Sequence, residues 1–409
     1  MQLDGKKLSF TTILLSGFID YAGMAMVFPL LTPLLFSPTS EFIAADASQL
    51  VRGIWLGVLL SIFPLMQFFF SPIFGALSDQ RGRKGLLVGT LSLALVGYLI
   101  GVFSIAVTSL PLLVASRICV GIAGGNCSIV SAVVADLSTS ENKAKNYGLL
   151  NMAFGGGFTL GPFLGGILAH RFGLVAAFSM AFFFVALNLI LVAWKFQETF
   201  YPSKWERKVG LFQAISHLKI AAKSISLRFV FLTLLLSAFG WAFFTEFVPL
   251  FFYDQYGFST GQIGMTFGYM GLIFSLSSGF LIDPIIRKWG ISISLFFSLL
   301  CSGFSLLLLL FVEATYVLLL LLPISQFFLS FIFPSLTSII SNKASEQKQG
   351  EALGIYQSVI ALALALTPLF SGGYIGSHPT YSVVVGGCFM ILAAVVFAAF
   401  QIFPSRVRS

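Results

Sequence analysis

The sequence predicts an all-α polytopic membrane protein with twelve transmembrane helices in two six-helix halves. Three observations lead to this fold class: 57% of the 409 residues are hydrophobic, only 9% are charged, and long runs contain no charged residue at all. An average soluble domain carries about a quarter charged residues, and a soluble fold of this length lacks the interior for so many apolar side chains. The composition therefore excludes a cytosolic enzyme, a secreted domain and a nucleic-acid-binding protein, despite a formal net charge of +8.

Runs without Asp, Glu, Lys or Arg mark most of the predicted helices, because a spanning helix needs about 20 mostly apolar residues. These runs are residues 53–78, 85–116, 146–170, 172–194, 255–282, 289–312, 314–342 and 352–405, the last of which is long enough for two spans. Three further spans carry one ionisable residue each, at about 10–36 (Asp20), 109–136 (Arg117) and 229–254 (Glu246). Strands of a membrane barrel would alternate in polarity, so the continuous runs favour helices.

The basic residues predict the orientation of these helices. Nearly all of the 23 Lys and Arg residues fall in connections that twelve alternating helices place on one side of the membrane. The other side carries Arg52 and Arg171, and Arg117 lies within a span. Basic connections stay in the cytoplasm. We therefore expect a multi-pass protein of the cell membrane, the inner membrane in a bacterium, with both termini cytoplasmic.

An internal repeat divides the chain. Residues 75–84, after the second predicted span, and residues 279–288, after the eighth, both fit the pattern G-x-L-x-D-x-x-x-R-K. Two halves explain this most simply: residues 1–195, a cytoplasmic linker at 196–228, and residues 229–409. Membrane proteins with such repeats are mostly transporters that rock one half against the other around a site near the midplane.

Asp20, Arg117 and Glu246 are unfavourable in the predicted spans, because placing a charge at the centre of a membrane-spanning helix costs about 2–3.5 kcal/mol or more of free energy. Each is expected to face a cavity or a partner. Low hydration favours the protonated form of a carboxyl group and a nearby cation opposes it, so Asp20 near Arg117 would be poised between proton loading and release. Glu246 would be a second proton site or the counter-charge of a cationic substrate. The alternatives are a static buried ion pair of Asp20 with Arg117 and a place for Glu246 near the outer interface.

A central substrate site needs polar and aromatic walls. Candidates at suitable depth are Asn126, Asn151, Phe154, Trp241, Phe243, Tyr269, Gln326, Tyr356 and Gln357. About a third of them are expected to contact substrate, since most such residues serve packing. The sequence has no Walker loop, nucleophile motif or His/Cys metal spacing. We therefore predict no catalysis, no metal and no cofactor.

The pattern G-x-L-x-D-x-x-x-R-K resembles the signature loop of the major facilitator superfamily, and the duplication, the twelve spans and the long central loop agree with that family. Three stretches are similar to its twelve-span drug/proton antiporter branch, near the tetracycline efflux proteins. The first span carries an acidic motif at residues 20–29, and the fourth carries R-x-x-x-G at residues 117–121. The fifth span matches the antiporter motif at Gly148, Gly157, Gly161, Pro162, Gly165 and Gly166.

The resemblance implies a latch built on the signature loop that begins at Gly75. In the family, the loop's acid and arginine engage an acid at the end of the fourth span, which here implies contacts among Asp79, Arg83 and Asp136. The latch would hold the two halves together in the outward-open state. In the second copy, which contains Asp283 and Arg287, the place of a matching acid is taken by Asn342. A symmetric second latch is therefore not implied.

The resemblance also implies a function: a proton-coupled secondary transporter that exports a small apolar or cationic compound by alternating access. Two alternatives remain. One is a proton-coupled importer or exporter of one specific metabolite, such as an amino acid, vitamin or siderophore. The other is a membrane sensor or scaffold, which would not need buried ionisable residues. The expected partners are protons, a small-molecule substrate and the lipid bilayer, without nucleic acid, and the expected oligomeric state is a monomer.

Overall fold

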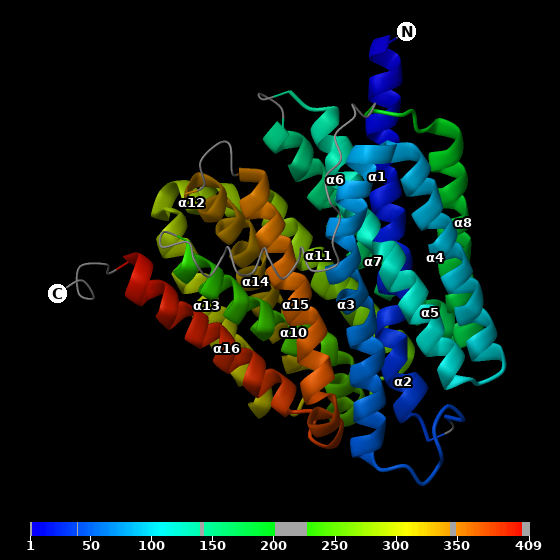
Figure 1. The fold of residues 1–409 in the computed structure, drawn as a ribbon. Helices are drawn as coiled ribbons and strands as arrows, with labels where there is room; N and C mark the ends of the chain where they lie inside the picture. The colour runs from blue at the N-terminus through cyan, green and yellow to red at the C-terminus, as the bar shows by residue number, and fades with distance from the viewer. Residues whose placement is uncertain (1, 39, 140–142, 201–226, 344–348, 403–409) are drawn as a thin grey trace. The chain divides into compact units, whose positions relative to one another are not determined.

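The computed structural model describes residues 2–38, 40–139, 143–200, 227–343 and 349–402, which fold into helices and short connections without strands (Figure 1). Within these residues, twelve helices are long and apolar enough to cross a membrane. The predicted all-α fold with twelve spans is confirmed. Most of the predicted linker at 196–228 lies outside the described residues.

Short 3-10 or π turns, labelled η, interrupt several spans. The first six spans are formed by α1 (Gln2–Val27), η1 (Phe28–Leu30), α2 (Leu31–Phe36), α3 (Gln49–Arg81), α4 (Arg83–Ala106), α5 (Leu110–Ala123), η2 (Gly124–Asn126), α6 (Cys127–Asp136), α7 (Lys143–Phe172) and α8 (Leu174–Lys195). The last six are formed by α10 (Arg228–Tyr256), α11 (Thr260–Leu276), η3 (Ser277–Leu281), α12 (Ile282–Trp289), α13 (Ile291–Leu308), η4 (Leu309–Phe311), α14 (Thr315–Lys343), α15 (Gln349–Ser377), α16 (Tyr381–Phe397) and η6 (Ala398–Ile402).

The chain forms two compact units. Unit 1 comprises Met1–Ala47, Ile62–Gln213 and Ser259–Gly271, and unit 2 comprises Ser48–Ser61, Ala214–Phe258 and Leu272–Ser409. Unit 1 thus contains most of the first six spans with the first part of α11, and unit 2 contains most of the last six with the first part of α3. The predicted division of the chain at a linker spanning 196–228 stays a prediction.

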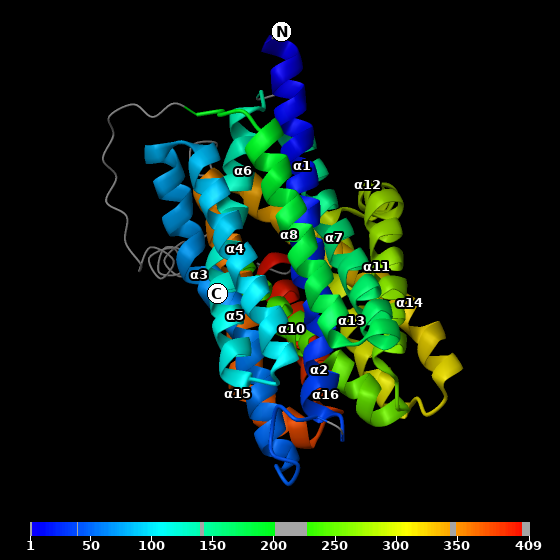
Figure 2. The ribbon, with the colours of Figure 1, turned by 90° about the vertical axis from the view of Figure 1, so that its right-hand side faces the viewer.

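The two units repeat one set of helix pairings. In unit 1, α1 packs against α7 and α8, and α4 packs against α5 and α8; α1, α4 and α8 lie side by side in Figure 2. In unit 2, α10 packs against α15 and α16, and α13 packs against α14 and α16. When spans are numbered from the start of each half, these pairings are the same. The repeat found in the loop motif therefore extends to the packing of the helices.

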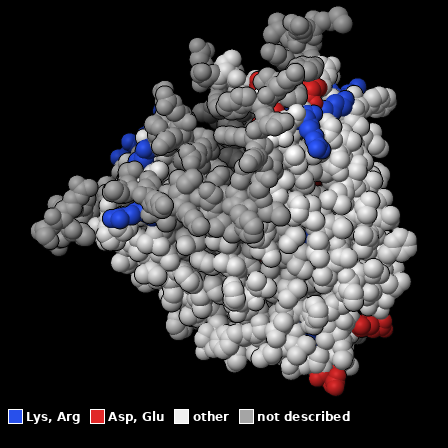
Figure 3. Space-filling view, viewed as in Figure 1, with Lys and Arg blue, Asp and Glu red and all other residues white. Residues whose placement is uncertain are grey.

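Apart from Asp20, Arg117 and Glu246, the described charged side chains lie near the ends of the helices or in the connections between them. On the face shown in Figure 3, the described Lys, Arg, Asp and Glu side chains lie near the margin of the view, and a broad area of described residues shows almost no charged side chain. This distribution is what a bilayer requires, because the hydrocarbon region offers a charged group neither water nor counter-ions.

Helices α1 and α7 meet along a seam of glycines. Three α7 glycines, one helical turn apart, press against three α1 carbonyl groups with the same spacing. The pairs are Gly157 with Phe18, Gly161 with Ala22, and Gly165 with Met26, and a Cβ atom on any of these glycines would collide with the partner carbonyl. Such contacts let two helix backbones approach closely in a membrane. The seam fixes the position of α1, which carries Asp20.

The other positions of the antiporter motif have different surroundings. Among the described residues, none has an atom within 4 Å of the place the Cβ of Gly148 would take. Gly166 packs against Gly264 of α11, which belongs to the same unit. Pro162 lies inside α7, which continues on both sides of it.

We predict that Gly161→Ala lowers the stability of the protein by about 1–3 kcal/mol, because the added methyl group overpacks the seam. Gly148→Ala is the matched control on the same helix and should leave stability unchanged or slightly higher, since alanine favours helix more than glycine does. The midpoint of thermal unfolding of the purified protein in detergent measures both. Equal shifts of this midpoint in the two variants would contradict the close packing of α7 against α1 at Gly161.

Candidate functional site

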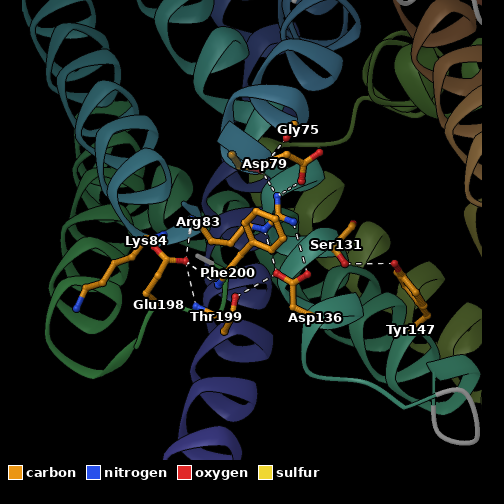
Figure 4. A network of polar contacts seen from close by, with 11 residues as sticks. Gly75, Asp79, Arg83, Lys84, Ser131, Asp136, Tyr147, Glu198, Thr199 and Phe200 are labelled. Atoms are coloured by element: carbon orange, nitrogen blue, oxygen red, sulfur yellow. Dashed lines mark hydrogen bonds and ion pairs between the residues drawn. The ribbon is translucent and has the colours of Figure 1, made fainter. Parts of the chain in front are cut away.

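Arg83 is the centre of a polar network in unit 1 (Figure 4). Its Nη1 lies 2.6 Å from Oδ1 of Asp79, and its Nε lies 3.0 Å from Oδ2 of Asp136. Arg83 also donates to the hydroxyl of Ser78, which in turn donates to the carbonyl of Gly75 at 2.8 Å. The structure therefore brings the residues of the predicted latch together. All of these contacts lie within unit 1, so the contact that would hold the two halves together stays a prediction.

The turn between α3 and α4 requires a glycine. Helix α3 ends at Arg81 and α4 begins at Arg83, and Gly82 between them has φ of +89°, a conformation that residues with a Cβ rarely adopt. Gly82 is the N-cap of α4, and no side chain caps the helix from that position. The first N–H groups of α4 therefore need acceptors from elsewhere in the chain.

Glu198 supplies these acceptors from the segment after α8. Its carboxylate accepts the N–H groups of Arg83 and Lys84 at 2.8 and 2.9 Å, and those of Thr199 and Phe200 at 3.0 and 3.1 Å. Partial burial alone would raise the pKa of Glu198, but these hydrogen bonds bring the pKa below its usual value of 4.5. The stabilisation is therefore complete above pH 4.5 and is lost only as the pH falls through the lowered pKa.

The second copy of the signature loop forms a similar pair in different surroundings. Nη2 of Arg287 lies 2.7 Å from Oδ2 of Asp283 within α12, but the two side chains are 78% and 72% exposed. The Arg83 side chain is only 5% exposed. Exposed pairs of this kind contribute about 0–1 kcal/mol. The two copies are therefore alike in sequence and unequal in their contacts.

A second polar cluster surrounds Asp20 of α1. Asp20 is half-buried and lies close to the side chain of Asn126 in η2. Tyr98 of α4 lies near both Asp20 and Arg117. Arg117 is 4% exposed, and its Cζ lies 5.5 Å from the centre of the Phe63 ring. The structure thus places Asn126 and Tyr98 at Asp20, and the direct pairing of Asp20 with Arg117 stays a prediction.

A small cavity adjoins this cluster. It has about 20 Å³ of space open to water, enough for about one molecule. Its lining includes Asp20, Tyr21, Gln67 and Tyr98. Gln67 donates to the carbonyl of Gly124 at 3.1 Å and is hydrogen-bonded to Tyr21. The cavity lies between α1, α3, α4 and α5 and belongs wholly to unit 1.

The predicted substrate-cavity residues lie in both units. In unit 1, Asn126 contacts Asp20, and Phe154 stacks on Tyr21 with ring centres 4.2 Å apart, whereas Asn151 and Tyr269 are exposed.

In unit 2, Trp241 packs edge-on against Phe333 and Phe243 stacks on Phe389. Gln326 and Tyr356 are buried and Gln357 is exposed. Glu246, the remaining predicted proton or counter-charge residue, is 7% exposed in α10. A single substrate cavity formed by the residues of both units stays a prediction.

With the fold and the two polar clusters described, the chain can be compared with known proteins. The family model of the Major Facilitator Superfamily matches residues 13–368 and, in a second match, residues 284–408. The chain belongs to the Major Facilitator Superfamily. It is therefore a multi-pass membrane protein of a transporter family.

Members of this superfamily that resemble the chain include drug resistance proteins. The chain is 28% identical over 362 residues to a class C tetracycline resistance protein of Escherichia coli, covering 86% of this chain and 85% of that protein. It is 27% identical over 335 residues to the quinolone resistance protein NorA of Staphylococcus aureus, covering 80% and 82%. The solved structure of the human organic anion transporter MFSD10 superposes with a TM-score of 0.73 at 23% identity, covering 96% of this chain and 99% of that one, which shows a shared fold.

Several residues of the Arg83 network and the Asp20 cluster were not predicted from the sequence. The carboxylate at the N-terminus of α4 is that of Glu198, which is not among the predicted site residues. Glu198 is an acid directly after a predicted span, at the start of a mostly basic stretch, a signal that could have identified it. Thr199 and Phe200 carry no comparable signal. Tyr98 gave none either, since one tyrosine in an apolar run is ordinary.

We predict that the two loop copies differ in their response to neutralisation. Asp136→Asn should destabilise the protein by about 1–3 kcal/mol, because it weakens a charge-assisted contact of the buried Arg83. Asp283→Asn, the control in the exposed copy, should change stability by less than about 0.5 kcal/mol. Thermal unfolding in detergent compares the two variants. A loss in Asp283→Asn as large as that in Asp136→Asn would contradict the difference between the copies.

Proposed function

We propose that the protein exports a small apolar or cationic drug-like compound in exchange for protons, by alternating access. Family membership supports transport, and the similarity to tetracycline and quinolone resistance proteins supports export of such compounds. The observation that carries the proton-coupling part is the position of Asp20. A carboxyl group within a membrane-spanning helix is costly and is retained where it has a function.

The surroundings of Asp20 suit a group that gains and loses a proton. The Asn126 amide can donate to a carboxylate and can accept from a carboxylic acid, so it can serve both states. The adjoining cavity has room for one water molecule, which would allow a proton to reach Asp20. Tyr98, which lies near both Asp20 and Arg117, would transmit the change of charge toward the arginine. We assign proton exchange to Asp20, with Arg117 as the responding cation.

Alternation between outward-open and inward-open states would be governed by the network around Arg83. Asp79 and Asp136 come from α3 and α6 and meet on one guanidinium group, so movement of either helix would break a contact. In this proposal the intact network belongs to the outward-open state. We also assign the protein to the cell membrane with cytoplasmic termini, as the distribution of basic residues predicts.

Transport in proteoliposomes tests this function. Vesicles with an acidic lumen are offered tetracycline, norfloxacin or the permanently charged dye ethidium. With a gradient of one pH unit, an electroneutral one-to-one exchange supports a concentration ratio of about ten. We expect Asp20→Asn to reduce this ratio to about one, because the variant has no carboxyl group to load. Asp46→Asn, in the exposed connection before α3, is the matched control and should accumulate the probe like the wild type.

Protein-free vesicles correct for passive trapping of weak bases. Accumulation by Asp20→Asn that remains fully dependent on the proton gradient would contradict the role of Asp20. Accumulation only in vesicles with an alkaline lumen would indicate symport and would favour a proton-coupled importer instead.

A further inference from the structure

Residues 196–200 follow α8, and each of them makes a different contact with the rest of unit 1. Phe196 is fully buried in a core cluster that includes Ile13 of α1 and Leu87 of α4. The next N–H, that of Gln197, donates to Oγ of Ser9 at 3.3 Å. The chain therefore leaves α8 in a fixed direction, and residues 198–200 are placed beside the Arg83 network.

Residues 198–200 contact three parts of that network. Glu198 binds the N–H groups of Arg83 and Lys84 at the start of α4. The hydroxyl of Thr199 donates to Oδ2 of Asp136 at 3.2 Å. The ring of Phe200 lies 4.7 Å from Cζ of Arg83, the geometry of a cation–π contact. Figure 4 shows Glu198 and Thr199 on the side of Arg83 away from Asp79, and the ring of Phe200 against the guanidinium.

Together these contacts restrict the freedom of the Arg83 side chain. The backbone of Arg83 is held through Glu198, and one face of the guanidinium is covered by Phe200. Oδ2 of Asp136, which accepts from Nε of Arg83 at 3.0 Å, is the same oxygen that accepts from Thr199. Glu198 therefore holds the backbone of Arg83, Phe200 contacts its guanidinium, and Thr199 holds the carboxylate that binds it.

We propose that residues 198–200 form a clasp that positions Arg83 across Asp79 and Asp136, so that the start of the connection between the halves controls the gating network. These are positioning residues, since they act through Arg83. The geometric part of the proposal is independent of the compound transported, and its consequence for the transport rate rests on the proposed function.

Hydrogen exchange of the full-length protein tests the geometric part. Glu198→Gln keeps the size of the side chain but removes its charge and one acceptor oxygen. We expect the first amides of α4, read in a peptide covering residues 82–86, to exchange about tenfold faster in this variant, the effect of losing about 1.4 kcal/mol. Glu313→Gln, at an exposed glutamate, is the control and should leave that peptide unchanged. Unchanged exchange in a folded Glu198→Gln protein would overturn the clasp.

Transport kinetics test the positioning role with smaller changes. Thr199→Val and Phe200→Leu should each lower kcat about three- to tenfold with KM unchanged, and Thr199→Ser, which keeps the hydroxyl, should restore the rate. Thr199→Val should have no further effect in an Asp136→Asn background, because that variant lacks the carboxylate that positions Arg83. Losses that multiply in the double variant, or a Thr199→Ser protein as slow as Thr199→Val, would overturn the role.

The two readouts separate this proposal from the proposed function. Faster exchange in Glu198→Gln, without transport of any probe by the wild type, would uphold the clasp and count against the exporter. Proton-driven transport with unchanged exchange and unchanged kcat in all three clasp variants would uphold the exporter and refute the clasp.

Discussion

The absence of water in the bilayer interior is the constraint on which the structure depends. Every backbone group within the hydrocarbon region needs a partner in the chain, and helices provide those partners within each segment. Polar side chains obey the same rule: the hydroxyls of Thr12, Ser131 and Thr159 each donate to a carbonyl one turn earlier in their own helix. A charged group has no such local solution. Several charges in or beside the spans of unit 1 are therefore found where helices meet, at Arg83 and around Asp20.

Both clusters are built on the same helices. Helix α6, ten residues long, begins directly after Asn126, which lies close to Asp20, and ends at Asp136, the partner of Arg83. A rigid helix of this length spans about 15 Å. Helix α4 makes a parallel link, with Arg83 at its start and Tyr98 further along. A change of charge at Asp20 that moved Asn126 or Tyr98 would thus displace the partners of Arg83. This arrangement gives the proposed exchange of protons a physical route to the proposed gating network.

The sequence predicted the parts of the structure that depend on composition and spacing. The uncharged runs, together with three spans that carry one ionisable residue each, located all twelve spans. The last run, which was predicted to be long enough for two spans, divides between α15, which ends at Ser377, and α16, which begins at Tyr381. Asp79 and Arg83 are four residues apart in the sequence, but Gly82 breaks the helix between them, so their contact also depends on the turn between α3 and α4. The approach of Asp136 was predicted only through the family resemblance, because no local pattern links residues that far apart in the chain.

The contacts that the sequence did not predict are those set by tertiary packing. Arg83 of the first loop copy is buried and contacts residues 198–200, and the loop motif alone, which both copies share, does not determine this burial. The capping of α4 by Glu198 joins residues 115 positions apart. The asymmetric roles of the glycines in the antiporter motif, with Gly161 pressed against α1 and Gly148 beside open space, likewise depend on which face of α7 meets a neighbour.

The central claim is that Asp20 gives up its proton when the protein takes up its substrate, and proton release tests it most directly. Purified protein in a weakly buffered detergent solution with a pH indicator is mixed with ethidium, and binding is measured separately by the dye's fluorescence. We expect about one proton to be released per bound dye molecule in the wild type and none in Asp20→Asn. Equal release by both proteins, or binding to the wild type without release, would contradict the claim.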